Sequence, residues 1–294
     1  MTSLIIITLR RAPLLRQTLA ALARQTRRPD EVVIVDNGPD SDTEAVAKEF
    51  GARYVVESRR GYGSARNRGL AEARGEVLYF LDDDCLAEPD WAERLWDTVD
   101  GGHADLACGS RGTARRGLAA RLEYLSTDGP VLSPRLAPGP APFLSTCNLI
   151  LKREVVDKIG AFDETLAMCE DRDFTARARA AGFRLRFEPA ARVTHLSSVE
   201  RPSDYLARMR HYGFGTSQYF AMRPEEPLAR LFPKSPAARL ALLPFLAAAG
   251  TGYLVLRNLP HGLDAIPLSP FLFAGQLAWH WGGWQAMRRY NREQ

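Results

Sequence analysis

Three short stretches near the N-terminus constrain the fold most strongly. Residues 3–8, SLIIIT, form a β-branched apolar run without clean alternation, which is typical of a strand buried on both faces of a parallel sheet. Residues 14–25, LLRQTLAALARQ, place leucines near helical spacing, and residues 31–36, EVVIVD, form a second buried run. A strand, a helix and a second strand within about 35 residues predict a βαβ unit.

The same pattern repeats along the chain. Its further segments are TEAVAKEF, ARYVVE, GSARNRGLAEA and EVLYFLDDD. The sequence therefore predicts an α/β fold with a Rossmann-like, mostly parallel central sheet. Ligands of open α/β sheets bind beyond the carboxyl ends of the strands, and each predicted strand here ends in a polar or acidic group. Asp36 and the triplet Asp82, Asp83 and Asp84 are thus placed at the expected site.

The aspartate triplet admits two interpretations. Three neighbouring carboxylates raise one another's pKa unless a cation intervenes, and a divalent metal with phosphate oxygens would supply that cation. Asp82 and Asp84 alternate to the same side of an extended segment, so both could face one ion. The alternative is a solvated acidic turn before the helix that begins near Trp91.

A second acidic pair and one histidine are further candidates. Glu170 and Asp171 precede a predicted helix, where acidic residues often satisfy unpaired N–H groups. Their functional interpretation is a general base that accepts a proton from an attacking hydroxyl. His195 ends a predicted strand and is either a buried, hydrogen-bonded histidine or, with the aspartates, part of a site for Mn²⁺ or a similar ion.

The composition indicates an ordinary globular protein. The chain has 294 residues, of which 46% are hydrophobic and 25% charged, which is typical of a globular protein of roughly two domains. Its four cysteines are spaced too widely for a zinc knuckle and are expected to be reduced in a cytosolic environment. No signal peptide is expected at the N-terminus.

The C-terminal part differs from the rest of the chain. From Arg201 onward there are 11 basic and 5 acidic residues, a net charge of +6, whereas residues 1–200 carry a net charge of −2. Residues 240–256 and 265–287 contain no Lys, Arg, Asp or Glu, so the basic excess lies beside apolar runs. This favours an anionic membrane surface over nucleic acid, either through a membrane hairpin or through helices lying on the surface. A soluble helical subdomain is the alternative.

This change in charge and hydrophobicity predicts that the chain divides into two regions. Residues 1–200 are predicted to form the α/β domain, and residues 201–294 a helical, membrane-associated region. Residues 111–143, rich in Arg, Gly and Pro, are expected to form an extended loop with one helix near 118–125.

Six stretches in order resemble family 2 glycosyltransferases of the GT-A fold, over residues 3–200. They are SLIIITLRR, LLRQTLAALARQTRRPDEVVIVDNGPDSDT, GYGSARNRGLAEARGEVLYFLDDDCLAEPDW, NLILKREVVDKIGAFDE, CEDRDF and VTHLSS. The resemblance implies an inverting transferase that uses a nucleotide-sugar donor and a divalent metal, Mn²⁺ or Mg²⁺. The basic, apolar C-terminal region adds the expectation of an acceptor, because YLARMRHYGFGTSQYF resembles the helix after the catalytic domain of bacterial polysaccharide glycosyltransferases. The expected acceptor is a lipid-linked or cell-envelope glycan at the cytoplasmic face of the plasma membrane.

The resemblance also assigns roles to single residues. It implies that Asp171 is the base, with Glu170 beside it, and that Asp82, Asp84 and His195 hold the metal. It implies contacts to the nucleotide sugar from Thr8, Arg10, Asp36, Arg66, Asp82 and Asp83. Two alternatives remain open, a noncatalytic membrane-associated partner of another transferase and a sugar-nucleotidyltransferase. The sequence indicates no nucleic-acid partner and leaves the oligomeric state open.

Overall fold

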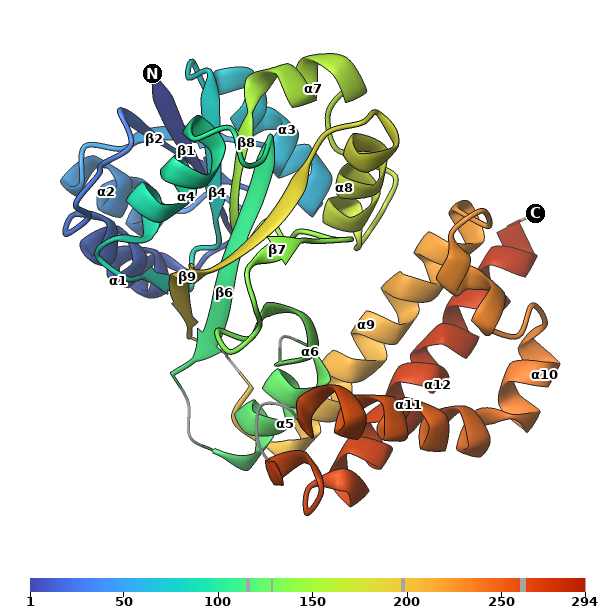
Figure 1. The fold of residues 1–294 in the computed structure, drawn as a ribbon. Coiled ribbons are helices and arrows are strands. Elements are labelled where there is room, and N and C mark those ends of the chain that lie inside the picture. The colour runs from blue at the N-terminus through green and yellow to red at the C-terminus, as the bar shows by residue number, and fades with distance from the viewer. Residues whose placement is uncertain (115–116, 128, 197–198, 260–262, 294) are drawn as a thin grey trace. The chain divides into compact units, whose positions relative to one another are not determined.

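The computed structural model describes residues 1–114, 117–127, 129–196, 199–259 and 263–293. These residues group into two compact units, shown in Figure 1. Unit 1 comprises Met1–Ala114 and Leu132–Leu196, and unit 2 comprises the described residues of 115–131 and 197–294. Residues 117–127, predicted from the sequence to lie in the first domain, therefore group with the C-terminal region.

Unit 1 contains a central sheet whose first half is parallel. Its four strands lie in the order β3, β2, β1, β4, and every neighbouring pair is parallel. Their bounds are β1 (Thr2–Thr8), β2 (Glu31–Asp36), β3 (Arg53–Val56) and β4 (Val77–Leu81). These are the apolar runs predicted from the sequence. Most of their apolar side chains are buried because helices cover both faces, whereas Val56 at the end of β3 is exposed. The predicted α/β class with a central sheet is confirmed.

The second half of the sheet is mixed. Strand β8 pairs antiparallel with both β4 and β6, and β9 pairs parallel with β6 and antiparallel with β5 and β7. The bounds are β5 (Cys85–Ala87), β6 (Leu106–Thr113), β7 (Gly139–Pro140), β8 (Asn148–Lys152) and β9 (Leu185–His195). Because β9 pairs with β5 directly after the aspartate triplet, this half brings His195 to the edge where β4 ends.

Helices cover both faces of the sheet in unit 1. Figure 1 shows α1, α2 and α4 on one face and α3, α7 and α8 on the other. The chain reverses direction across the sheet between β3 and β4, and right-handed crossovers then place α3 opposite α1 and α2. The bounds are α1 (Ala12–Leu22), α2 (Ser41–Glu49), α3 (Tyr62–Glu72), α4 (Trp91–Asp100), α7 (Arg153–Ile159) and α8 (Glu170–Ala180).

Unit 2 is helical. The helix expected near 118–125 is present as α5 (Leu118–Ser126), and α6 (Gly129–Leu132) follows where the chain returns to unit 1. The remaining elements are α9 (Pro202–Met222), η1 (Pro227–Leu231), α10 (Pro236–Ala241), α11 (Leu243–Asn258), η3 (Leu263–Ala265) and α12 (Ser269–Glu293). Their shared apolar core includes Leu122, Tyr205, Met209, Leu254 and Leu272.

The two uncharged runs of the C-terminal region form α11 and most of α12. Helix α11 has 16 residues, fewer than the roughly 20 that a helix needs to span a membrane at a rise of about 1.5 Å per residue. Helix α12 has 25 residues but includes Gln276, His280 and three arginines near its end. Among the residues that the structure describes, no helix is both long enough and apolar enough to cross a membrane.

Candidate active site at the edge where the parallel strands end

The ends of β1 and β2 bring Thr8 and Asp36 side by side. The two residues are partners in the parallel register, and both are buried. One carboxylate oxygen of Asp36 accepts a hydrogen bond from the backbone N of Gly38 at 3.0 Å, and the other accepts one from the Tyr54 hydroxyl at 2.9 Å. Asp36 therefore holds the loop that follows β2. Its predicted contact to a nucleotide stays a prediction.

Asp83, the middle residue of the triplet, points into the protein. Its Oδ2 accepts a hydrogen bond from the Thr8 hydroxyl at 2.6 Å, and its Oδ1 accepts one from Nη1 of Arg11 at 2.9 Å. Its backbone carbonyl accepts a third, from the Thr18 hydroxyl at 2.9 Å. Burial raises the pKa of Asp83 to about 7, and the positive charge of Arg11 opposes that rise. Asp83 is thus fixed by β1 and α1.

Asp84 is buried between the side chains of an arginine and a histidine. Its Oδ2 accepts a hydrogen bond from Nη2 of Arg11 and lies 3.3 Å from Nε2 of His195. Burial alone would raise the pKa of Asp84, but His195 and Arg11 hold it well below its usual range. The pairing of Cys85 with His195 across β5 and β9 explains why the histidine lies here.

Asp82 is the most exposed member of the triplet. Its side chain is 30% exposed, and its Oδ1 lies 3.8 Å from Nη2 of Arg66. Possible ligand atoms of Asp82, Asp84 and Cys85 lie within 4.8 Å of one another, the one such group among the described residues. His195 is outside this group and adjoins it through Asp84. Two carboxylates with a neighbouring imidazole suit Mn²⁺, and carboxylates suit Mg²⁺, so the residues present fit a divalent cation.

Arg66 connects the triplet to the second acidic pair. Besides approaching Asp82, it forms a buried ion pair with Glu170, although the two residues are 104 positions apart in the sequence. Arg66 lies on α3, and Glu170 is the first residue of α8. A buried guanidinium needs such partners, because removing one would leave an uncompensated charge. The two acidic clusters predicted separately from the sequence therefore form one site.

Asp171 differs from Glu170 beside it. Its carboxylate is half-buried and accepts a hydrogen bond from the backbone N of Arg172 at 2.8 Å. Burial, and then the negative charge of Glu170, raise the pKa of Asp171 to about 7, while Arg66 opposes the rise. The preceding residue, Cys169, has a left-handed backbone with φ of 66°, which turns the chain sharply into α8. Asp171 thus lies at a fixed helix start with a pKa suited to proton transfer.

The arginines of the loop after β1 behave differently from one another. Arg10, predicted to contact the nucleotide sugar, is exposed and has a left-handed backbone with φ of 52°. Its charge lowers the pKa of Asp40, a smaller effect than the hydrogen bond that Asp40 accepts from Thr43. The neighbouring Arg11, for which the sequence predicts no role, contacts both Asp83 and Asp84. The signal available in the sequence is the two adjacent arginines directly before the predicted helix.

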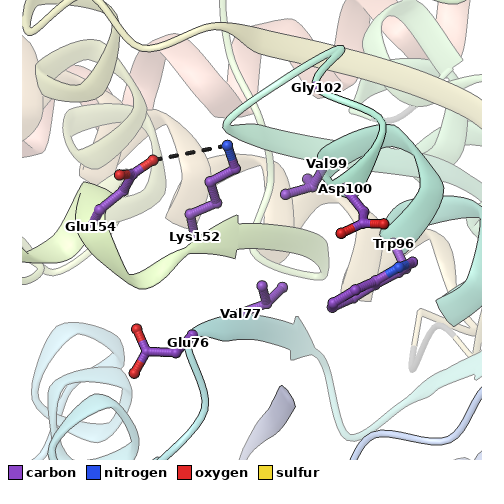
Figure 2. A pocket seen from close by; sticks show the side chains of 8 residues that line it. All are labelled: Glu76, Val77, Trp96, Val99, Asp100, Gly102, Lys152 and Glu154. Atoms are coloured by element: carbon purple, nitrogen blue, oxygen red, sulfur yellow. Dashed lines mark ion pairs between the residues drawn. The ribbon is translucent and has the colours of Figure 1, made fainter. Parts of the chain in front are cut away.

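A separate cavity lies at the opposite end of β4. It has a volume of about 410 Å³, and its lining includes Val77, Trp96 and Lys152, shown in Figure 2. Val77 begins β4, whereas Asp82 follows the end of that strand. Figure 2 also shows Lys152 turned toward Glu154, 3.9 Å away. This cavity is therefore distinct from the acidic site.

The known sequences that this chain resembles are those of glycosyltransferases. The family model of glycosyl transferase family 2 matches residues 3–160. Glycosyltransferase AglE of Haloferax volcanii is 30% identical over 194 residues, which cover 63% of this chain and 63% of that protein. The pre-mycofactocin glycosyltransferase of Mycobacterium tuberculosis is 29% identical over 220 residues, which cover 68% of this chain and 44% of that protein. The chain thus spans less than two thirds of the length of these two relatives.

Solved structures agree on the fold. The mannosyltransferase PcManGT from Pyrobaculum calidifontis, in complex with GDP-Man and Mn²⁺, aligns with a TM-score of 0.62 over 93% of this chain and 85% of that chain, at 20% identity. GalNAc-T7 with UDP, GalNAc and Mn²⁺ aligns with a TM-score of 0.55 over 79% of this chain and 51% of that chain, at 17% identity.

The family match covers more than half of the chain and includes β1, the aspartate triplet and Arg66. The structural likeness to PcManGT covers 93% of the chain, a larger share than the family match. Both agree with the resemblance found in the sequence. The chain belongs to glycosyl transferase family 2 and has the GT-A fold.

Proposed function

We propose that the chain transfers a sugar from a nucleotide-sugar donor to a hydroxyl group of an acceptor, with inversion at the anomeric carbon. One observation carries the proposal. Arg66 joins Asp82 of the triplet to Glu170, whose neighbour Asp171 has a pKa of about 7. Groups suited to binding a diphosphate and a group suited to accepting a proton therefore share one site.

The donor would bind at the edge where β1, β2 and β4 end. Thr8, Arg10, Asp36, Arg66, Asp82 and Asp83 are the residues proposed to bind or support it. Asp82, Asp84 and His195 would hold a divalent cation, Mn²⁺ or Mg²⁺. When bound, such a cation offsets charge that develops on a departing diphosphate. The proposed donor site is supported by the Mn²⁺ and nucleotide in complexes of proteins with the same fold.

Asp171 would act on the acceptor. Its carboxylate accepts the proton of the acceptor hydroxyl while the hydroxyl oxygen forms a bond to the anomeric carbon. The bond from that carbon to the diphosphate oxygen breaks on the opposite face, and its electron pair leaves with the diphosphate. A carboxylate is too weak a base to form a free alkoxide, so proton transfer accompanies bond formation. Glu170 stays paired with Arg66 and positions the start of α8.

Two variants separate binding from chemistry. We expect Asp171→Asn to keep Mn²⁺-dependent binding of a nucleoside diphosphate and to lose transfer by about 10²–10⁴-fold, the usual contribution of a general base. Asp84→Asn should lose the metal-dependent binding itself. Calorimetric titration with UDP, GDP, CDP and dTDP, with and without Mn²⁺, measures the binding, and release of the diphosphate measures the transfer.

The control is Asp157→Asn, which removes an exposed carboxylate from α7 and should leave binding and transfer unchanged. A folded wild-type chain that binds none of the four nucleotides in the presence of Mn²⁺ would overturn the proposed donor site. It would favour the alternative of a noncatalytic, membrane-associated partner. A nucleoside triphosphate consumed together with a sugar phosphate would instead indicate a sugar-nucleotidyltransferase.

We further propose that the acceptor is a lipid-linked or cell-envelope glycan, and that unit 2 binds the cytoplasmic face of the membrane. Large apolar side chains on its surface support this, since Phe245 is 71% exposed and Leu256 is 68% exposed on α11. The net charge of +6 from residue 201 onward adds attraction to anionic lipids. Exposed apolar residues beside basic ones are typical of helices that lie on a bilayer.

Vesicle binding tests this part of the proposal. The chain should sediment with phosphatidylglycerol vesicles and much less with phosphatidylcholine vesicles, and the double variant Phe245→Ser with Leu256→Ser should weaken the binding. Val56→Ser, which changes an exposed apolar residue of β3 in unit 1, is the matched control. Equal binding by the double variant and wild type would contradict membrane binding through α11.

A further inference from the structure

Arg11 joins two of the three aspartates at the start of α1. Its Nη1 donates to Oδ1 of Asp83 at 2.9 Å, and its Nη2 donates to Oδ2 of Asp84. The Arg11 side chain is 35% exposed, whereas both carboxylates are almost fully buried. The guanidinium thus supplies positive charge to two buried carboxylates and also faces solvent on one side.

The oxygen of Asp84 that Arg11 contacts has a second donor. His195 approaches the same Oδ2 with its Nε2 at 3.3 Å. A carboxylate oxygen has two lone pairs, and two nitrogen groups already lie against this atom. A cation that binds Asp84 through Oδ2 must therefore displace at least one of these donors. Its charge would also repel the guanidinium, which lies against the same carboxylate.

Asp83 has contacts that do not depend on Asp84. The Thr8 hydroxyl donates to its Oδ2, and the Thr18 hydroxyl donates to its backbone carbonyl. Neither contact involves Asp84, so both can persist while the contacts of Asp84 change. If Nη1 of Arg11 stays on Asp83, the guanidinium remains at the site after Nη2 leaves Asp84.

We propose that Arg11 couples the binding of the divalent cation to the binding of the diphosphate. This inference rests on the proposed function. Without ligands, Nη2 of Arg11 occupies Asp84 and opposes the cation. When cation and diphosphate bind together, Nη2 leaves Asp84 and donates to a phosphate oxygen, while Nη1 stays on Asp83. A planar guanidinium with several donors suits a phosphate group, and the phosphate removes the repulsion between the two positive charges.

Replacing Arg11 should change the affinity for Mn²⁺ and the affinity for the diphosphate in opposite directions. In Arg11→Gln, Mn²⁺ alone should bind about tenfold more tightly, because Asp84 has lost a competing cation. The nucleoside diphosphate should bind the Mn²⁺-loaded variant about tenfold more weakly, because a phosphate contact is lost. The factor by which diphosphate strengthens Mn²⁺ binding should consequently fall about tenfold or more. A purely structural arginine would not strengthen the binding of Mn²⁺ when removed.

The experiment measures free Mn²⁺ by electron paramagnetic resonance, with and without whichever of UDP, GDP, CDP and dTDP binds the wild type. Arg16→Gln is the matched control, since it removes one positive charge from the exposed side of α1 and breaks only the surface pair with Glu49. Arg11→Lys is the second variant, because it keeps the charge and loses the two-nitrogen geometry. It should bind Mn²⁺ alone as the wild type does and bind the diphosphate more weakly.

Unchanged or weaker binding of Mn²⁺ alone by a folded Arg11→Gln variant would overturn the inference. If Arg11→Gln does not fold, tight diphosphate binding by Arg11→Lys would overturn it instead. Failure of the wild type to bind any of the four nucleotides would count against the proposed function and against the diphosphate half of the inference. Tighter Mn²⁺ binding by Arg11→Gln would in that case still support the competition at Asp84.

Discussion

Glu170 and Asp171 are adjacent carboxylates in different electrostatic environments. Glu170 is buried against Arg66, and that ion pair suits a positioning role. Asp171 is half-buried, and its pKa is raised to about 7 by burial and by the charge of Glu170. An ion-paired carboxylate next to one whose pKa is raised suits a division between structural and proton-transfer roles.

The pKa of Asp171 predicts how transfer depends on pH. A base must be deprotonated to accept a proton, so a pKa raised to about 7 makes activity fall as the pH drops below 7. We expect kcat/KM to decrease about tenfold for each unit below that value and to level off above it. A rate profile between pH 5 and pH 9 measures this acidic limb.

Asp171→Glu provides the matching variant, because it keeps a carboxyl group and alters its distance and burial. Its acidic limb should move in pH while remaining visible, whereas Asp171→Asn should show no such limb in its residual activity. A wild-type profile that is flat down to pH 5 would count against Asp171 as the base.

At the scale of elements, close contact between α9 and α12 shapes unit 2. A Cβ atom added to Gly213 would lie 1.8 Å from the carbonyl oxygen of Trp279, and one added to Gly282 would lie 1.9 Å from that of Arg210. Residue 213 therefore faces residue 279 and residue 210 faces residue 282, so the helices run antiparallel. Glycine at these two positions lets the helix backbones approach closely.

Gly282→Ala should destabilise unit 2. Its added methyl group overlaps backbone of α9, which cannot move aside as a flexible side chain can. We expect a loss of about 1–3 kcal/mol in the free energy of unfolding, the usual cost of overpacking. Urea denaturation followed by circular dichroism measures the change.

Gly252→Ala on α11 is the control for helix propensity. Nothing lies within 4 Å of the position that its Cβ would take, so the same substitution meets no obstacle there. Alanine is favoured over glycine in a helix by roughly 0.8–1 kcal/mol, so this variant should be as stable as the wild type or slightly more stable. If both variants were stabilised alike, close packing of α9 against α12 would be refuted.

At the scale of the whole molecule, the sequence predicts unit 1 better than unit 2. The apolar runs at β1, β2 and β4 identify the parallel half of the sheet, and its topology places Asp36 and Asp82 at one edge. The antiparallel half has no comparable signal, because β8 and β9 lie far from their partner strands in the chain. For the same reason the ion pair between Arg66 and Glu170 could not be predicted from spacing.

Unit 2 shows a different reason why sequence patterns are incomplete. The uncharged runs at 240–256 and 265–287 indicate apolar surroundings but do not distinguish lipid from the side chains of other helices. In the structure, Leu254 and Leu272 from these runs pack with Tyr205 and Met209 of α9.

The role of Arg11 could not be predicted from the sequence, because it depends on the fold of the aspartate triplet and not on the residues beside Arg11 in the chain.

The placement of α5 in unit 2 has a consequence for synthesis on the ribosome. Helix α5 ends at Ser126, but the α9 residues that pack with its Leu122 are synthesised only after Arg201. At about 5–20 residues per second, the ribosome makes that stretch in about 4–15 s. During this interval the apolar side of α5 has none of its α9 partners to pack against. The nascent chain therefore has a period in which an unburied helix is available to chaperones.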